Sequence, residues 1–225
     1  MKKGKFIVID GTDGSGKKTQ ADILIKRLKK LKYKTALFDF PQYYSSFFGK
    51  MVGRYLKGEF GKSDDVSPYL SSLLYAGDRW QAKEKILQNL NEGKIVVTNR
   101  YVPSNLAYQG AKLPSKERRK FFHWLENLEY QYYKIPKENL VIFLYVPVEI
   151  GQGLVDGKGH RKYLGGKKRD IHEENLSYLK KVEKLYQEFC KTRKNWHCVI
   201  CTQNGKILSR EQIAERIWEK VRKSI

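Results

Sequence analysis

Short apolar segments alternate along the chain with longer segments in which apolar residues recur every three or four positions. The short segments are rich in β-branched and aromatic residues, which is typical of strands buried inside a sheet. From this pattern we predict five strands, at residues 5–9, 35–40, 95–98, 140–146 and 197–201.

The longer segments have the apolar spacing of amphipathic helices that cover a sheet. Ser67 and Pro68 mark the start of one of them, because proline is favoured in the first turn of a helix. Gly93 lies just beyond the expected end of the same helix. We expect helices at residues 21–31, 47–56, 67–90, 104–111, 115–132, 171–189 and 213–221.

Strands that alternate with helices are typical of an α/β fold, in which helices cover both faces of a parallel sheet. No internal repeat or linker interrupts the alternation. We therefore predict one domain over residues 1–225, built on a five-stranded parallel sheet.

One segment departs from this pattern. Residues 157–169, with the sequence GKGHRKYLGGKKR, contain four glycines, six basic residues and no acidic residue. So many glycines disfavour a helix, and so many charges disfavour burial. We predict a mobile cationic loop.

The net charge is unusually positive, because 45 lysines and arginines face 24 acidic residues, which gives +21. Such a chain attracts polyanions. Most of the excess is lysine spread over the predicted helices, whereas surfaces that read nucleic-acid bases favour arginine. We interpret the charge as a solvated surface and do not expect nucleic acid as a partner.

Two further features bear on the compartment. No apolar run is long enough to span a bilayer, and the N-terminal apolar run is too short for a signal peptide. The three cysteines do not form an even disulfide framework, which agrees with a reducing compartment. We expect a cytoplasmic protein without membrane contact.

A glycine-rich segment between the first predicted strand and the first helix matches the P-loop pattern G-x-x-x-x-G-K. Its glycines let backbone N–H groups point at a phosphate chain, and its lysine adds a full positive charge. The fold is therefore predicted to be of the P-loop NTPase type, with Lys17 as a catalytic residue. The predicted ATP site comprises Gly11, Thr12, Asp13, Gly14, Ser15, Gly16, Lys17, Lys18 and Thr19.

One position departs from the P-loop pattern. Lys18 occupies the place of the Ser or Thr whose hydroxyl ligates Mg²⁺. A charged lysine cannot ligate a metal, so the phosphates and water are expected to hold most of the Mg²⁺. The protein ligands of the metal are unknown at this stage.

Beyond the P-loop, the chain resembles the thymidylate (dTMP) kinases over nearly its whole length. The resemblance implies an enzyme that phosphorylates dTMP to dTDP with ATP and Mg²⁺ in deoxythymidine nucleotide biosynthesis, commonly as a homodimer. Five segments in family order carry it: GTDGSGKKTQ, FPQYYSSFFGKMVGRYLKGEFG, LLYAGDRW, NRYVPSNLAYQGAK and RDIHEENLSYLKKVEKLYQEF.

Candidate acceptor-site residues follow from position and from the resemblance. Arg100 lies just past the third predicted strand, where parallel sheets present their ligands, and is our candidate for the catalytic cation at the acceptor phosphate. Tyr75 and Arg79 lie one turn apart on one helix, and the resemblance implies that they stack on thymine and bond a base oxygen. It further implies that Asp13 accepts a hydrogen bond from the 3′-hydroxyl. The resemblance adds Ser104, Asn105, Tyr108 and Gln109 around the sugar and base, and Phe40, Pro41 and Tyr43 on the phosphate side.

The basic loop corresponds to the lid of the family, at about residues 156–170. Gly14 stands where some family members carry a catalytic arginine in the P-loop. We expect the lid to supply that charge, with Arg161 and Arg169 as candidate catalytic residues. The resemblance also implies that Glu173 faces the sugar, and we expect His172 to be structural.

Two positions depart from the family pattern. Asn99 stands where most members have an aspartate, and Gln42 stands where many have an arginine at the acceptor phosphate. One negative and one positive charge are therefore absent from the same end of the site.

Two other functions remain open. The chain could be a kinase for another nucleoside monophosphate or for a deoxynucleoside, because its base specificity rests on analogy at Tyr75, Arg79 and Tyr108. A P-loop nucleic-acid-binding protein fits less well, because no second helicase-like domain and no RNA-binding signature is present.

Overall fold

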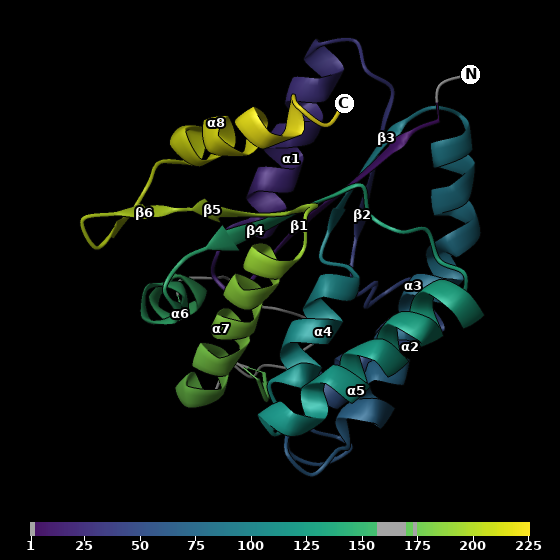
Figure 1. Ribbon diagram of the computed structural model, residues 1–225, viewed down its shortest axis with the longest axis vertical. Coiled ribbons are helices and arrows are strands. Elements are labelled where there is room, and N and C mark those ends of the chain that lie inside the picture. Colours follow the sequence, from purple (N-terminus) through teal and green to yellow (C-terminus); the bar gives the residue numbers. More distant parts are fainter. Residues whose placement is uncertain (1–2, 157–169, 173–174) are drawn as a thin grey trace.

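A computed structural model describes residues 3–156, 170–172 and 175–225. Five parallel strands form the sheet in the order β2-β3-β1-β4-β5 (Figure 1). This confirms the predicted α/β class and the five-stranded parallel sheet. The strands are β1 Lys5–Gly11, β2 Thr35–Asp39, β3 Ile95–Asn99, β4 Leu140–Tyr145 and β5 Trp196–Ile200.

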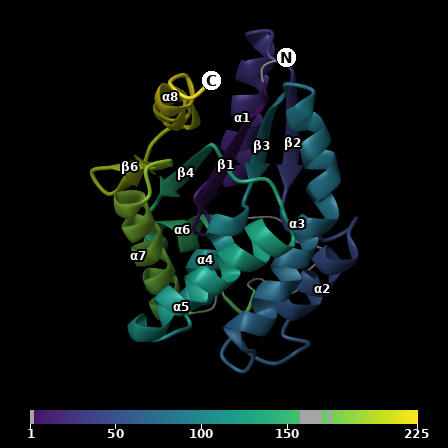
Figure 2. The ribbon, with the colours of Figure 1, turned by 45° about the vertical axis from the view of Figure 1, so that its right-hand side comes forward.

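The helices follow the strands in alternation. They are α1 Lys17–Lys30, α2 Phe47–Leu56, α3 Pro68–Asn91, α4 Val102–Gly110, α5 Ser115–Glu126, the π-helix η1 Asn127–Tyr132, α6 Val148–Asp156, α7 Leu176–Thr192 and α8 Arg210–Val221. Helices α1 and α8 pack together on one face of the sheet, and α3, α4 and α7 cover the other (Figure 1, Figure 2).

The central strand β1 shows why both faces are covered. Its side chains from Phe6 to Ile9 are fully buried and alternate between two apolar cores. Phe6 and Val8 belong to the core beneath α3, α4 and α7, and Ile7 and Ile9 to the core beneath α1 and α8. A strand buried on both sides reads as a continuous apolar run, which is how the sequence presents it.

Three elements differ from the expectations. Helix α6 was not predicted, because Gly151 and Gly153 weaken its helical pattern. Helix α7 begins at Leu176, later than expected, because the Asn175 side chain caps it by accepting from the Tyr178 backbone N–H (2.9 Å). The predicted helix 115–132 is α5 followed by the π-helix η1.

A short antiparallel pair also follows β5. Strands β6 Thr202–Gln203 and β7 Lys206–Ile207 flank a turn at Asn204 and Gly205, both of which have positive φ. Within the described ranges no helix is both long enough and apolar enough to cross a membrane.

The parallel arrangement places the functional segments at one edge of the sheet. The P-loop follows β1, Phe40 follows β2 and Arg100 follows β3. Because the carboxyl ends of parallel strands meet at the same edge, these segments come together although the sequence separates them widely.

Candidate active site

The P-loop joins β1 to α1 in the conformation that its glycines permit. Gly14 and Gly16 have positive φ, 84° and 82°, which L side chains rarely adopt. Lys17 opens α1, and its Nζ donates to the carbonyl oxygen of Thr12 (2.8 Å). The hydroxyls of Thr12 and Ser15 are buried and have no hydrogen-bond partner among the described residues. The loop thus has the form of a phosphate cradle.

The absence of an arginine from position 14 has a steric cause. A Cβ atom at Gly14 would lie 2.1 Å from the carbonyl oxygen of Gly151 in α6. The backbones of the P-loop and α6 therefore touch, and no side chain fits between them.

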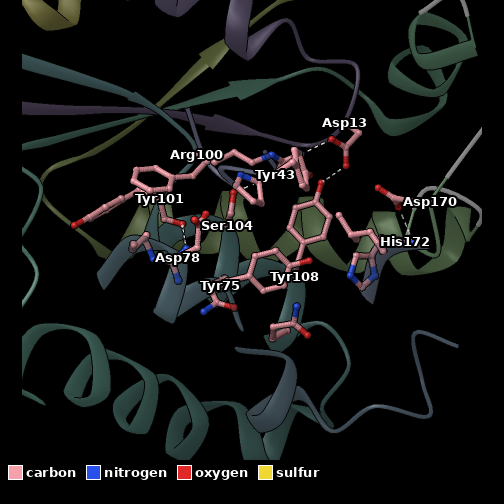
Figure 3. Close-up of a pocket in the computed structure, with 16 residues that line it drawn as sticks. Asp13, Tyr43, Tyr75, Asp78, Arg100, Tyr101, Ser104, Tyr108, Asp170 and His172 are labelled. Atoms are coloured by element: carbon pink, nitrogen blue, oxygen red, sulfur yellow. Dashed lines mark hydrogen bonds and ion pairs between the residues drawn. The ribbon is translucent and has the colours of Figure 1, made fainter. Parts of the chain in front are cut away.

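A pocket lies beside the P-loop (Figure 3). The segments after β1, β2 and β3 reach it, together with α3 and α4. Eleven predicted substrate-binding residues line it: Asp13, Phe40, Pro41, Tyr43, Tyr75, Arg79, Arg100, Ser104, Asn105, Tyr108 and Gln109. The structure therefore brings these residues together, while the roles that the resemblance implies for them stay predictions.

Asp13 links the P-loop to this pocket. Its Oδ1 forms an ion pair with Arg100 Nη2, and its Oδ2 accepts a hydrogen bond from the Tyr108 hydroxyl (2.7 Å). Burial alone would lower the pKa of Arg100, but the charge of Asp13 and the contributions of Tyr108 and Asp10 together outweigh burial and raise that pKa, so the guanidinium remains charged. Arg100 is held in place as a fixed cation, with φ of 62°.

Asp10, at the end of β1, was not among the predicted site residues. Its Oδ1 accepts from the hydroxyls of Ser104 (2.7 Å) and Tyr186 (2.8 Å). Its Oδ2 is buried and has no hydrogen-bond partner in the described part of the chain. In the sequence, Asp10 appeared only as the polar residue that ends an apolar run.

Asp78 is a second buried carboxylate that the sequence did not reveal. Its Oδ2 accepts from the backbone N–H of Gln42 (2.9 Å), and its Oδ1 accepts from the Ser46 hydroxyl. Burial raises the pKa of Asp78. Through these bonds α3 fixes the segment after Phe40 and Pro41, which forms one wall of the pocket (Figure 3).

Arg79 is buried and paired with Glu129, which lies in the π-helix η1. Its Nε donates to Glu129 Oε2 (2.7 Å) and its Nη2 to Oε1 (2.5 Å). The third nitrogen, Nη1, lies 3.4 Å from the carbonyl oxygen of Tyr101. Glu129 is fully buried, so the pair positions a charged guanidinium at the pocket wall.

Two buried side-chain amides present opposite polarity to the pocket. Asn105 Nδ2 bonds the Ser72 carbonyl (3.2 Å) and Glu129 Oε1 (3.3 Å), which leaves its Oδ1 as an acceptor without a partner among the described residues. Gln109 Oε1 accepts from the Ser71 hydroxyl (2.7 Å), and in the described chain its Nε2 has no partner. The neighbours thus fix one acceptor and one donor that no described residue engages.

Near the P-loop, Lys18 and Asn99 both contact Asp39. Asn99 Nδ2 donates to Asp39 Oδ1 (2.6 Å), and Lys18 Nζ lies 3.8 Å from Asp39 Oδ2. A carboxylate therefore lies beside Asn99, although position 99 itself lacks one. Thr19 lies half-buried in the first turn of α1.

Several predictions fall outside the described residues. Arg161, Arg169 and Glu173 are among them, as is nearly all of the proposed lid. Their roles stay predictions. In the part of the chain that is described, no cluster of three or more His, Cys, Asp or Glu side chains could hold a metal ion.

Comparison with known proteins places the chain in a family. A family model described as thymidylate kinase matches residues 9–213. A probable thymidylate kinase from Pyrobaculum aerophilum is 32% identical over 182 residues, which cover 80% of each chain. The human thymidylate kinase is 28% identical over 205 residues, covering 88% of this chain and 82% of the human one.

A solved structure shows the same fold. The thymidylate kinase from Candida albicans superposes with a TM-score of 0.72 and 24% identity, covering 98% of this chain and 92% of that one. The match of the family model over most of the chain extends well beyond the P-loop, which many unrelated enzymes share. The chain therefore belongs to the thymidylate kinase family.

Proposed function

We propose that this protein transfers the γ-phosphoryl group of ATP to dTMP and so forms ADP and dTDP in deoxythymidine nucleotide biosynthesis. The observation that carries the proposal is the link through Asp13. This residue belongs to the P-loop and also holds Arg100 and Tyr108 of the neighbouring pocket. A donor site and an acceptor site are thereby fixed against each other, which is what phosphoryl transfer between two nucleotides requires.

The donor side is the P-loop. Its backbone N–H groups, the N-terminus of α1 and the Lys17 ammonium group suit the phosphates of ATP. Lys17 would leave its contact with the Thr12 carbonyl to reach them. The positive charge would stabilise the transferring group more as negative charge develops on it.

One buried carboxylate at the end of β1 suits a magnesium ion. Asp10 Oδ2 is a buried carboxylate oxygen without a hydrogen-bond partner in the described chain, and carboxylate oxygens are preferred Mg²⁺ ligands. We propose that Asp10 is the chain's contribution, with phosphates and water as the other ligands. The ion would neutralise phosphate charge.

The acceptor side is the pocket. Arg100 would hold the phosphate of dTMP and offset its charge while it attacks. That phosphate is already a nucleophilic anion at neutral pH, so the reaction needs no general base. Tyr75 provides an aromatic face for the base, and its ring lies edge-on to Tyr55 with centroids 6.3 Å apart.

The two free amide groups favour a base of the thymine type. Thymine presents an N3–H donor next to carbonyl acceptors, which matches the Asn105 Oδ1 acceptor and the Gln109 Nε2 donor. Cytosine presents an unprotonated N3 and an amino group, so it would set acceptor against acceptor. This favours dTMP over the rival reading of a kinase for a cytosine nucleotide.

The specificity can be tested with the wild-type enzyme. We expect kcat/KM to be at least about 100-fold higher for dTMP than for dCMP, because mismatched buried polar groups are strongly rejected. Coupled assays of ADP formation with each nucleotide at equal ATP measure the ratio. Equal values would contradict the assignment of Asn105 and Gln109 to the base.

Arg100→Ala tests the acceptor phosphate site. The substitution should weaken dTMP binding by about 2 kcal/mol or more, because it leaves a phosphate charge unpaired in the pocket. Calorimetry with dTMP and, separately, with a non-hydrolysable ATP analogue measures both sites. An equal loss of affinity for both ligands would contradict the assignment of Arg100 to the acceptor phosphate.

We also propose that the protein is a homodimer in the cytoplasm. Each chain would form one catalytic domain, and the enzyme would act without nucleic acid. A second copy would cover exposed apolar side chains on α2 and α3, among them Phe47 and Leu70, which are 65% and 62% exposed. Sedimentation velocity measures the association state, and a monomer at micromolar concentration would contradict it.

A further inference from the structure

His172 has a nitrogen atom that no described residue satisfies. The residue lies in the turn before α7, and its side chain is buried at the edge of the pocket (Figure 3). Its Nδ1 lies 3.1 Å from the Ser63 hydroxyl. Its Nε2 is buried and has no hydrogen-bond partner among the described residues. A buried polar atom left without a partner is unfavourable, so a ligand atom is expected there.

Three rings fix the orientation of this imidazole. It stacks on Tyr178 with centroids 5.3 Å apart and an interplanar angle of 28°, and it packs against Tyr55 and Tyr108 at 5.6 and 5.8 Å. With Nδ1 tied to Ser63, the ring has little freedom to turn. A side chain held in this way can position a hydrogen bond in advance of binding.

The ring is uncharged under ordinary conditions. Burial and, to a smaller extent, the charge of the nearby Lys112 lower the pKa of His172 to about 3, although Asp13 acts in the opposite direction. When the Ser63 hydroxyl donates to Nδ1, Nε2 carries the hydrogen and is a neutral donor. Such a donor can bond an uncharged oxygen such as that of a hydroxyl group.

The position of His172 identifies which part of the acceptor it faces. On one side it contacts Tyr108, whose hydroxyl donates to Asp13 in the P-loop. On the other side it contacts Tyr55, which packs on Tyr75 at the base end. The imidazole therefore lies between the phosphate end and the base end of the pocket, where the sugar of the acceptor must bind.

We propose that His172 is a substrate-binding residue whose Nε2–H donates a hydrogen bond to the 3′-hydroxyl of the acceptor deoxyribose. The 3′-hydroxyl is the free hydroxyl of a deoxynucleoside monophosphate. It both donates and accepts, so it can donate to the Asp13 carboxylate while it accepts from His172. The inference rests on the proposed function, because it assumes that the pocket binds such an acceptor.

The test is a cycle of two proteins and two ligands. Wild type and His172→Phe are each titrated by calorimetry with dTMP and with its 2′,3′-dideoxy analogue, which lacks only the 3′-hydroxyl. Phenylalanine keeps an aromatic ring for Tyr178 but has no Nε2. We expect the variant to lose about 5- to 10-fold in affinity for dTMP and almost nothing for the dideoxy analogue, as one hydrogen bond predicts.

The controls separate a direct contact from a structural role. His123→Phe, at an exposed histidine on α5, should leave both affinities unchanged. His172→Gln, which places a polar amide at this position, should retain part of the preference for dTMP. This variant replaces His172→Phe in the test if the Phe variant does not fold. Melting temperatures identify variants that fail to fold.

Two outcomes would overturn the inference. One is an equal loss for both ligands in His172→Phe, which would mean that the residue only supports the pocket or holds a water molecule. The other is an unchanged preference for dTMP. If wild type itself bound no dTMP, the proposed function would fail instead, so the two failures are distinguishable.

Discussion

Lys17→Ala is expected to abolish measurable phosphoryl transfer while the protein remains folded. The ammonium group lies at the start of α1 inside the P-loop, and removing a preorganised charge of this kind costs at least about 100- to 1,000-fold in kcat. The hydrogen bond of this side chain to the Thr12 carbonyl lies within the loop and outside the apolar cores, so its loss should change the stability of the fold little. Steady-state turnover and the melting temperature are measured together.

Lys26→Ala is the matched control, because Lys26 is exposed on the same helix and lies away from the loop. It should keep wild-type turnover. Near-normal turnover in a folded Lys17→Ala protein would contradict the assignment of the P-loop to the phosphate donor.

Glu129→Gln is expected to cost about 3–5 kcal/mol of unfolding free energy, the largest stability effect that we predict. Arg79 is buried, and the substitution would leave its guanidinium without the carboxylate that pairs with two of its nitrogens. Urea unfolding measures the loss. The matched control is Glu126→Gln, whose partner Arg193 is partly exposed and whose loss should cost under about 1 kcal/mol.

A double variant separates stability from recognition. Replacing the pair together, as Arg79→Met with Glu129→Leu, should restore much of the stability, because no unpaired charge remains buried. It should still bind dTMP poorly, because Asn105 and the pocket wall lose their fixed neighbours. A cost below about 1 kcal/mol in Glu129→Gln would contradict the role of this pair.

The sequence predicted features whose signals are local. The five strands are apolar runs, and the P-loop is contiguous from Gly11 to Lys17, so both could be found without a structure. The pocket residues from Ser104 to Gln109 followed from motifs that resemble one family. Helix α6 was missed because its glycines hide the pattern, and Gly151 is needed there for contact with the P-loop.

The residues that hold the pocket together could not be predicted. Glu129 lies 50 positions from Arg79 and sits in a π-helix, whose wider turn leaves no clear spacing in the sequence. Asp78 lies next to Arg79 on α3, yet its role depends on the Gln42 backbone and Ser46, more than 30 residues away. Such contacts exist only once the chain has folded.

In the proposed function, the P-loop and the pocket are two halves of one site for phosphoryl transfer to dTMP. The most direct measurement follows the label from ATP that carries ³²P in its γ-phosphate, with dTMP or with single-stranded DNA as the second reactant. We expect saturable transfer of the label to dTDP with dTMP and none with DNA. Hydrolysis of ATP that is stimulated by DNA and indifferent to dTMP would contradict it.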